Sequence, residues 1–185
     1  WRTLLAACRV YKAFDLAEKV VEHIVELKAI EAGDYILLLN TYSSNQKWDK
    51  VTNLRMFLRE NKIMTIPGCC SIEMKGVVHE FVAGDVKHPR KDEIYKMVDE
   101  ILKQLKMGGY VSQVESELRD LNASEKEKAL CYHSEMLAVA FGVISTPPGM
   151  TIRVASSVRV CVDCHEFGKV FSAVYDWKLI IRDRN

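Results

Sequence analysis

The sequence predicts an α/β protein in which a short all-α pair of helical repeats precedes a sheet domain. Residues 1 to about 62 repeat with a period of 34 residues, the period of two-helix solenoid units. Farther on, a strand pattern over Thr151–Val160, a helical pattern over Val162–Tyr175 and a strand pattern over Lys178–Arg182 predict a β-α-β unit. These patterns predict three segments, at 1–66, 67–122 and 123–185.

The first segment shows its repeat in aligned apolar and aromatic positions. A shift of 34 residues aligns Leu4-Leu5 with Leu38-Leu39, Cys8 with Tyr42, Phe14 with Trp48, Val20 with Leu54 and Ile24 with Leu58. Such units resemble tetratricopeptide-like repeats, and each leaves an apolar face that a neighbour must cover. We therefore expect the pair to continue an upstream array or to dock on the sheet domain. Pro67 disfavours helix in the residue before it, so the array should end near Thr65-Ile66.

The second segment predicts a hairpin and a helix. Alternating apolar residues over 71–74 and 77–82 flank Lys75-Gly76, which predicts a β-hairpin. A helical pattern then runs from Pro89 to Lys106, and residues 110–123 form a polar connection. We expect His79 and His88 to be isolated structural or solvated side chains, and the adjacent Cys69-Cys70 to be ordinary packing.

The third segment predicts an interrupted helix. Ser124 and Glu127 have the spacing of a capping box, so a helix should begin there. In an unbroken helix His133 and Glu135 would point about 200° apart, given roughly 100° of rotation per residue. We therefore expect a break near Tyr132-His133, so that both side chains can serve one site.

Composition narrows the classes of function. The formal net charge is +1 and the charges alternate in sign, so a nucleic acid substrate would need another part of the protein for most of its affinity. No apolar run approaches the roughly 20 residues that span a bilayer, and we expect no membrane partner. The six cysteines suit metal ligands and buried thiols in a reducing compartment better than a disulfide framework.

Two short motifs carry the chemistry. His133-Ser134-Glu135 is followed, after 25 intervening residues, by Cys161-Val162-Asp163-Cys164. One histidine and two cysteines can hold a tetrahedral Zn²⁺ and leave the fourth position for water, which zinc acidifies. Glu135 could then move the proton of that water, the arrangement used in zinc-dependent nucleobase deaminases. The alternative is a closed structural zinc site made from the two cysteines and two histidines.

These motifs, with others along the chain, resemble a known family. Residues 1–67 resemble the E1 and E2 motifs, and the rest resembles the DYW-type cytidine deaminase domain, of plant organellar pentatricopeptide-repeat RNA-editing factors. The matching strings are Pro67-Gly68-Cys69, Val78-His79-Glu80-Phe81-Val82-Ala83-Gly84-Asp85, His88-Pro89, His133-Ser134-Glu135, Leu137-Ala138-Val139-Ala140-Phe141-Gly142 and Cys161-Val162-Asp163-Cys164-His165. The sequence departs from the family in having Ser71 near a usual aromatic position, and from the deaminase signature in having Val160 before the first cysteine.

The resemblance implies a fold, an activity and partners. It implies a cytidine-deaminase-like α/β/α sandwich and zinc-dependent conversion of cytidine to uridine in single-stranded organellar RNA, in a plastid or mitochondrion. His133, Cys161 and Cys164 would be the zinc ligands and Glu135 the catalytic acid–base. An upstream pentatricopeptide-repeat array would choose the site, and other editing factors would be further partners. The alternative function is a non-catalytic zinc-binding interaction module of an RNA-processing complex.

Two expectations concern the ends of the chain, and a third concerns its middle. Family members continue beyond Asn185 into a tail rich in histidine and cysteine that helps His165 bind a second, structural zinc. Without that tail His165 is either a second-zinc ligand or a bystander. Because Trp1 opens in a helical pattern without methionine, we expect the chain to be part of a longer protein. The 67–122 segment exceeds a minimal deaminase core, and we expect it to gate the pocket.

Overall fold

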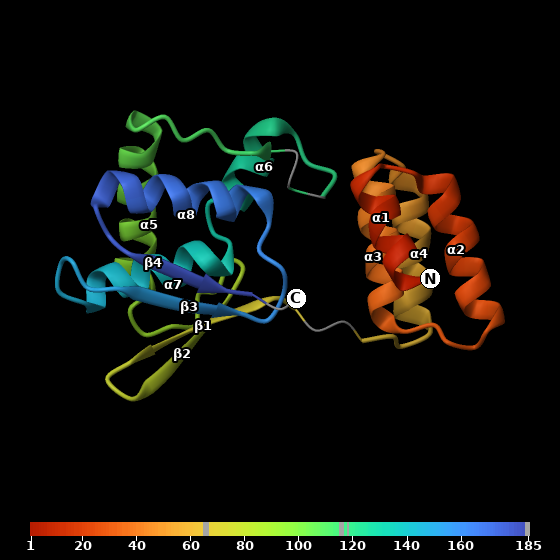
Figure 1. Ribbon diagram of the computed structural model, residues 1–185, viewed down its shortest axis with the longest axis horizontal. Coiled ribbons are helices and arrows are strands. Elements are labelled where there is room, and N and C mark those ends of the chain that lie inside the picture. The colour runs from red at the N-terminus through yellow and green to blue at the C-terminus, as the bar shows by residue number, and fades with distance from the viewer. Residues whose placement is uncertain (65–66, 115–116, 118, 184–185) are drawn as a thin grey trace. The chain divides into compact units, whose positions relative to one another are not determined.

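The computed structural model describes residues 1–64, 67–114, 117 and 119–183. The chain divides into two compact units. Unit 1 comprises Trp1–Ile66 with Leu118–Asp120, and unit 2 comprises Pro67–Glu117 with Leu121–Asn185. Unit 1 is helical, whereas unit 2 combines helices with a sheet (Figure 1). The expectation of a mixed helical and sheet protein is confirmed.

Unit 1 contains the four helices that the sequence predicts. They are α1 (Arg2–Val10), α2 (Phe14–Glu26), α3 (Ala32–Ser44) and α4 (Trp48–Glu60). The 34-residue spacing recurs just beyond the helix ends, where Lys12 and Gln46, and likewise Lys28 and Lys62, have positive φ angles. Aligned apolar positions of the repeat fill one core. The assignment to tetratricopeptide-like repeats stays a prediction, and the expected end at Thr65-Ile66 lies outside the described residues.

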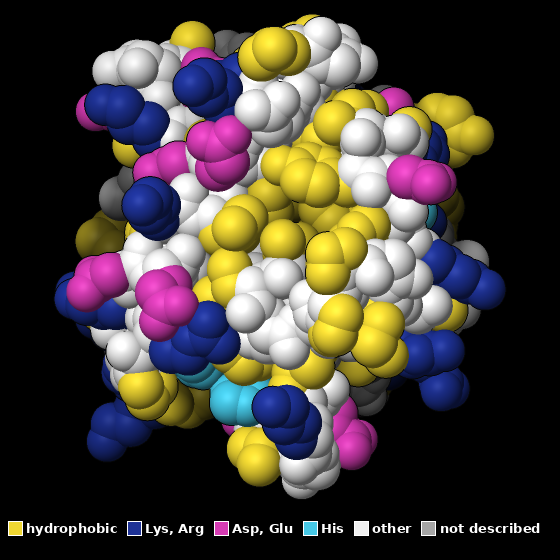
Figure 2. Space-filling model, turned by 90° about the vertical axis from the view of Figure 1, so that its left-hand side faces the viewer, with side chains coloured by type: hydrophobic (Ala, Val, Ile, Leu, Met, Phe, Trp, Pro, Cys, Tyr) yellow, Lys and Arg dark blue, Asp and Glu magenta, His cyan; other side chains and the backbone are white. Residues whose placement is uncertain are grey.

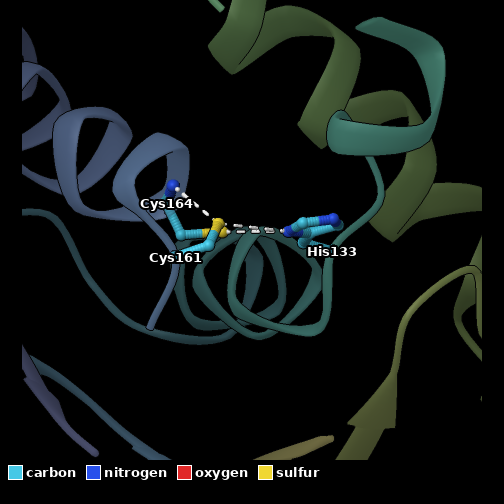
Figure 3. A group of neighbouring side chains, drawn as sticks. All are labelled: His133, Cys161 and Cys164. Carbon is cyan, nitrogen blue, oxygen red and sulfur yellow. Dashed lines mark hydrogen bonds between the residues drawn. The ribbon is translucent and has the colours of Figure 1, made fainter. Parts of the chain in front are cut away.

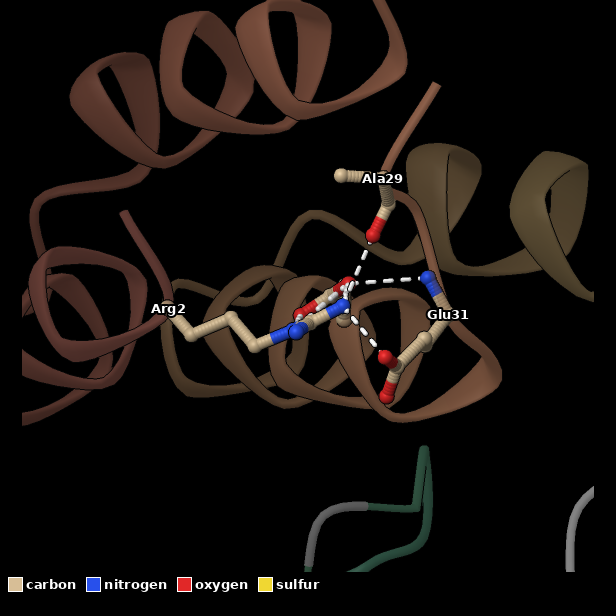
Figure 4. Close-up of polar contacts among 4 residues, drawn as sticks. Arg2, Ala29 and Glu31 are labelled. Atoms are coloured by element: carbon tan, nitrogen blue, oxygen red, sulfur yellow. Dashed lines mark hydrogen bonds and ion pairs between the residues drawn. The ribbon is translucent and has the colours of Figure 1, made fainter. Parts of the chain in front are cut away.

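A polar cluster fixes the start of α3 in unit 1. Asp34 is 1% exposed, and its carboxylate accepts from Arg2 Nε at 2.9 Å and from the backbone N–H of Glu31 at 2.9 Å. The Arg2 guanidinium also donates to the carbonyl of Ala29 at 2.7 Å (Figure 4). Because buried charges must be paired, this cluster ties α1 to the α2–α3 connection.

Unit 2 is built on a four-stranded mixed sheet. Its strands are β1 (Cys69–Met74), β2 (Val77–Val82), β3 (Ile152–Ser156) and β4 (Leu179–Arg182), in the order β2-β1-β3-β4. The β1–β2 and β1–β3 pairs are antiparallel, and the β3–β4 pair is parallel. The register places Cys70 opposite Ser156. The predicted hairpin and β-α-β unit are both present.

Four helices accompany the sheet in the described part of unit 2. They are α5 (Lys91–Met107), α6 (Ala123–Leu130), α7 (Ser134–Ser145) and α8 (Val162–Tyr175). The apolar α7 packs on β1, β2 and β3 and against α5, which also contacts α8 (Figure 1). A Cβ at Gly142 would come within 2.9 Å of an Ile152 methyl group, so glycine permits the close approach of α7 to the sheet. Arg153 and Ala155 on the other face are exposed, and the α/β/α sandwich stays a prediction.

Several predicted boundaries differ from the observed ones. The strand expected to reach Val160 ends at Ser156. Ser157 then bonds to the start of β1: its N–H donates to the Cys69 carbonyl, and its Oγ accepts from the Cys69 N–H. The capping box of α6 is formed by Asn122 and Glu125 instead of Ser124 and Glu127. The helix expected from Pro89 to Lys106 spans Lys91–Met107.

Surface features agree with the balanced composition. Figure 2 shows a face with an apolar hollow near its centre, bordered by both basic and acidic side chains. Within the described ranges, no helix is both long and apolar enough to cross a bilayer.

Candidate active site

The first half of the site is the connection between α6 and α7. Helix α6 ends at Leu130, and His133 is the N-cap of α7, with extended φ and ψ of −61° and 151°. The N–H of His133 bonds to the Leu130 carbonyl, and its own carbonyl accepts from Leu137 as α7 begins. This is the break that the sequence predicts. It places Glu135 in the first turn of α7, close to the His133 side chain.

The second half of the site is the start of α8. Cys161 is the N-cap, and its Sγ accepts a hydrogen bond from the backbone N–H of Cys164 at 3.4 Å. The preceding residue is also fixed, because the N–H of Val160 donates to Asp183 Oδ2 at 3.1 Å. Both sulfur atoms therefore lie at a helix N-terminus, where backbone N–H groups stabilise negative charge.

His133, Cys161 and Cys164 converge on one point. His133 Nδ1 lies 3.5 Å from Cys161 Sγ and 3.4 Å from Cys164 Sγ (Figure 3). The three donor atoms all lie within 4.8 Å of one another. Ligands 2.0 and 2.3 Å from a tetrahedral Zn²⁺ have nitrogen and sulfur roughly 3.5 Å apart. The donor types and their spacing thus fit zinc.

The two thiols differ in acidity. Donation from the Cys164 thiol lowers the pKa of Cys161 to about 5, with further stabilisation of the thiolate by His133 and despite burial. The pKa of Cys164 is raised well above its usual value by its bond to Cys161, by burial and by Glu135. Burial disfavours the charged form of His133, but Cys161, Glu135 and Glu117 raise its pKa. Cys161 is therefore the more acidic of the two thiols.

Glu135 lies beside the three donors. The residue is 5% exposed, and its Oε2 lies 3.7 Å from Cys164 Sγ. Ser134 Oγ donates to Oε2 at 3.1 Å, and Ser156 Oγ donates to Oε1 at 3.3 Å. The carboxylate is thus buried and hydrogen-bonded on both oxygens, within reach of a group held by the ligands.

His165, although adjacent to Cys164 in sequence, lies outside the group. It is exposed and borders a cavity of about 500 Å³ between α8 and β4, together with Asp183. Within the part of the chain that the structure describes, the metal-type group contains three residues, without a second histidine. The closed site of two cysteines and two histidines is therefore not formed there.

Sequence reasoning missed several residues near the site. Cys70, expected to be ordinary packing, is fully buried, and Ser134, Ser156 and Glu135 are its polar neighbours. Asp163, between the two cysteines, is also fully buried, and Glu117 is 7% exposed. The sequence did contain a signal for Asp163, because a charged residue between the two cysteines of the C-x-x-C motif lies close to the predicted site. Cys70 and Ser156 had no local signal, because strand pairing brings them together from 86 positions apart.

The expectation that His79 and His88 are isolated was wrong. His79 Nδ1 lies 3.1 Å from His88 Nε2, and both rings contact Phe141 of α7. Burial lowers the pKa of His88, and the nearby His79 adds to this effect. The backbone N–H of Arg90 donates to His88 Nδ1, so this nitrogen carries no proton and the ring is neutral in this arrangement. The contact of His79 with Phe141 joins β2 to α7. The pair is structural.

Comparisons with known proteins give two family matches along the chain. Residues 109–185 match the DYW family of nucleic acid deaminases, and residues 11–73 match the E motif. A pentatricopeptide repeat-containing protein of Arabidopsis thaliana is 59% identical over the whole chain, which covers 32% of that relative. A chloroplastic one from the same plant is 45% identical, over 99% of the chain and 30% of its own length. The mitochondrial pentatricopeptide repeat-containing protein OGR1 of Oryza sativa subsp. japonica is 42% identical, over 100% of the chain and 31% of its own length.

The chain spans about a third of the length of these relatives. Its two matches follow one another along the sequence, and the His-x-Glu and C-x-x-C motifs both fall within the second. The chain therefore carries an E motif followed by a domain that belongs to the DYW family of nucleic acid deaminases.

Proposed function

We propose that this chain catalyses the zinc-dependent hydrolytic deamination of cytidine to uridine in RNA. The observation that carries the proposal is the convergence of His133, Cys161 and Cys164 beside the buried carboxylate of Glu135. Three nitrogen and sulfur ligands with an adjacent carboxylate are the parts that zinc deaminases use. A closed structural site would need a fourth protein ligand, and the described group has three.

Each side chain has a role that agrees with its position. His133 Nδ1 and the sulfur atoms of Cys161 and Cys164 would hold the zinc ion, which when bound acidifies water and provides a nucleophile at neutral pH. Glu135 Oε2 faces the ligand side, so it would accept the proton of water and deliver it to the departing amine. Water replaces the amino group of cytosine, and the products are uridine and ammonia.

The substrate is proposed to be single-stranded RNA in a plant organelle. A base in a duplex would have to be flipped out, whereas a single strand presents it directly. The names of two relatives place them in the chloroplast and the mitochondrion, and the relatives are pentatricopeptide repeat-containing proteins. Since the net charge of the chain is only +1, an upstream repeat array would supply most of the RNA affinity and choose the site. Other editing factors are proposed as further partners.

Replacing Glu135 tests the reaction. We expect Glu135→Ala in the full-length protein to keep its zinc and to lose at least about 100-fold in conversion rate, the scale of general acid–base catalysis. Glu73→Ala, which removes an exposed glutamate on β1, is the matched control and should keep both. The measurements are zinc content by elemental analysis and the uridine fraction of a target RNA by sequencing. Conversion by Glu135→Ala at the wild-type rate would refute the assignment.

We also propose that the 67–122 segment gates this site. Tyr110 Oη and the backbone N–H of Gln113 donate to Asp163 Oδ1 at 2.8 and 2.7 Å. Asp163 stands between the two cysteines, so these bonds fasten the segment to the ligand-bearing helix. Glu117, farther along the segment, is buried and is one of the charges that raise the pKa of His133. These contacts support a cover that must loosen before a base can enter.

A further inference from the structure

Ser156 is a polar residue at a core-facing position of β3. The inward positions of this strand are Ile152, Val154 and Ser156, whereas Arg153 and Ala155 are exposed. Strict alternation would put another apolar residue at 156. The hydroxyl is instead buried, with Ser156 8% exposed. A buried hydroxyl lowers stability unless it has a hydrogen-bond partner, so its partner indicates what the position is for.

The partner of this hydroxyl is the far oxygen of Glu135. Ser156 Oγ donates to Oε1 at 3.3 Å, while Oε2 points to Cys164 Sγ at 3.7 Å. The two carboxylate oxygens therefore face different sides, one toward the sheet and one toward the metal-type group. A hydrogen bond to the sheet-side oxygen restricts rotation of the carboxylate and so keeps the other oxygen directed at the metal-type group.

Strand pairing sets the position of Ser156 in the sheet. Strand pairing sets Ser156 opposite Cys70 of β1, which is fully buried and also contacts the Glu135 carboxylate. Side chains directly opposite on paired strands lie on the same face within a few ångströms. Ser134 differs, since it donates to Oε2, the oxygen that must be free to exchange protons. The Ser156 bond is made instead to Oε1, on the side of the carboxylate away from Cys164.

We propose that Ser156 is a positioning residue that orients the Glu135 carboxylate for proton transfer. The role rests on the deaminase function proposed above, because Glu135 is the proton carrier there. Loss of an oriented hydrogen bond to a charged group should slow the chemical step about tenfold without changing substrate binding.

The kinetic test uses the zinc-loaded full-length protein and its target RNA. We expect Ser156→Ala to lower kcat about tenfold with KM and zinc content unchanged. Ser157→Ala is the matched control, because among the described residues the neighbouring hydroxyl bonds to the Cys69 backbone and not to Glu135. It should keep kcat within about twofold. Ser156→Cys preserves the volume with a weaker donor and should fall between alanine and wild type. A Ser156→Ala kcat equal to that of the wild type, or loss of zinc in both Ser156 variants, overturns the proposal.

A stability measurement tests the same contact without turnover. If Ser156 and Glu135 interact, Ser156→Ala should lower the thermal midpoint of unit 2 less in a Glu135→Ala background than in the wild type. Equal shifts in both backgrounds overturn the proposal. The two proposals fail separately: a wild type that does not convert cytidine refutes the deaminase function, whereas the stability cycle still decides whether Ser156 holds Glu135. An active wild type with additive variants refutes only the positioning role.

Discussion

At the scale of single residues, the two cysteines of the C-x-x-C motif are not equivalent. Cys161 is the N-cap of α8, and its Sγ accepts a hydrogen bond from the backbone N–H of Cys164. This bond and the helix N-terminus stabilise a negative charge on that sulfur. Cys164 is fully buried beside Glu135, which opposes a charge on its own sulfur. Cys161 is thus the more acidic of the two thiols, and a cation bound beside Cys164 would favour its deprotonation.

This asymmetry predicts a pattern of thiol reactivity. In the metal-free chain at pH 7 we expect Cys161, whose pKa is lowered to about 5, to react with iodoacetamide first. Burial raises the pKa of Cys70 to about 12 and that of the half-buried Cys69 above its usual value, so both should react slowly. Peptide mapping by mass spectrometry measures each rate. Added zinc should protect Cys161, and a Cys161 rate no faster than that of Cys69 would contradict the pattern.

At the scale of elements, the connection between α5 and α6 is fastened to the start of α8. Tyr110 is 3% exposed, and its hydroxyl and the Gln113 N–H share one oxygen of Asp163. The other oxygen, Asp163 Oδ2, is buried without a hydrogen-bond partner among the described residues. A carboxylate with one unsatisfied oxygen is a costly anchor, which is compatible with the proposed gating role.

Removing one anchor should loosen this connection. We expect Tyr110→Phe to speed hydrogen exchange of the Gln113 amide about tenfold, because one of the two bonds to Asp163 is lost. Tyr11→Phe, at an 82% exposed tyrosine of unit 1, is the matched control and should leave that amide unchanged. Exchange followed by mass spectrometry with and without target RNA measures both. The gating role is contradicted if residues 110–114 stay as protected as α7 in every state.

At the scale of the whole molecule, much of the architecture could be predicted from local patterns. The four helices of unit 1, the hairpin and the break before His133 agree with periodicity, glycine placement and the geometry that one metal site demands. The grouping of His133 with Cys161 and Cys164 agrees with motif spacing. These features depend on residues close in sequence, or on chemistry that requires convergence.

The features that could not be predicted depend on packing between distant segments. The β1–β3 register pairs Cys70 with Ser156, and the fold sets that register through the sheet's buried face. The contact of His79 with His88 likewise needs both rings to meet Phe141. The α6 capping box shifted two residues because Asn122 and Glu125 satisfy the same end of the helix. In each case a nonlocal or competing local interaction determined the result.

Because all three proposed ligands lie in unit 2, zinc should stabilise one unit and not the other. A ligand that binds only the folded state adds about 2.7 kcal/mol at 100 times its Kd, so chelation should lower the midpoint of unit 2. Unit 1 has its own core and contributes none of these ligands, so its midpoint should not move. Heating with and without chelator, read by hydrogen exchange of α2 and α7, separates the units. A Cys161→Ser variant should remove the zinc-dependent shift, and equal shifts in both units would contradict a metal site confined to unit 2.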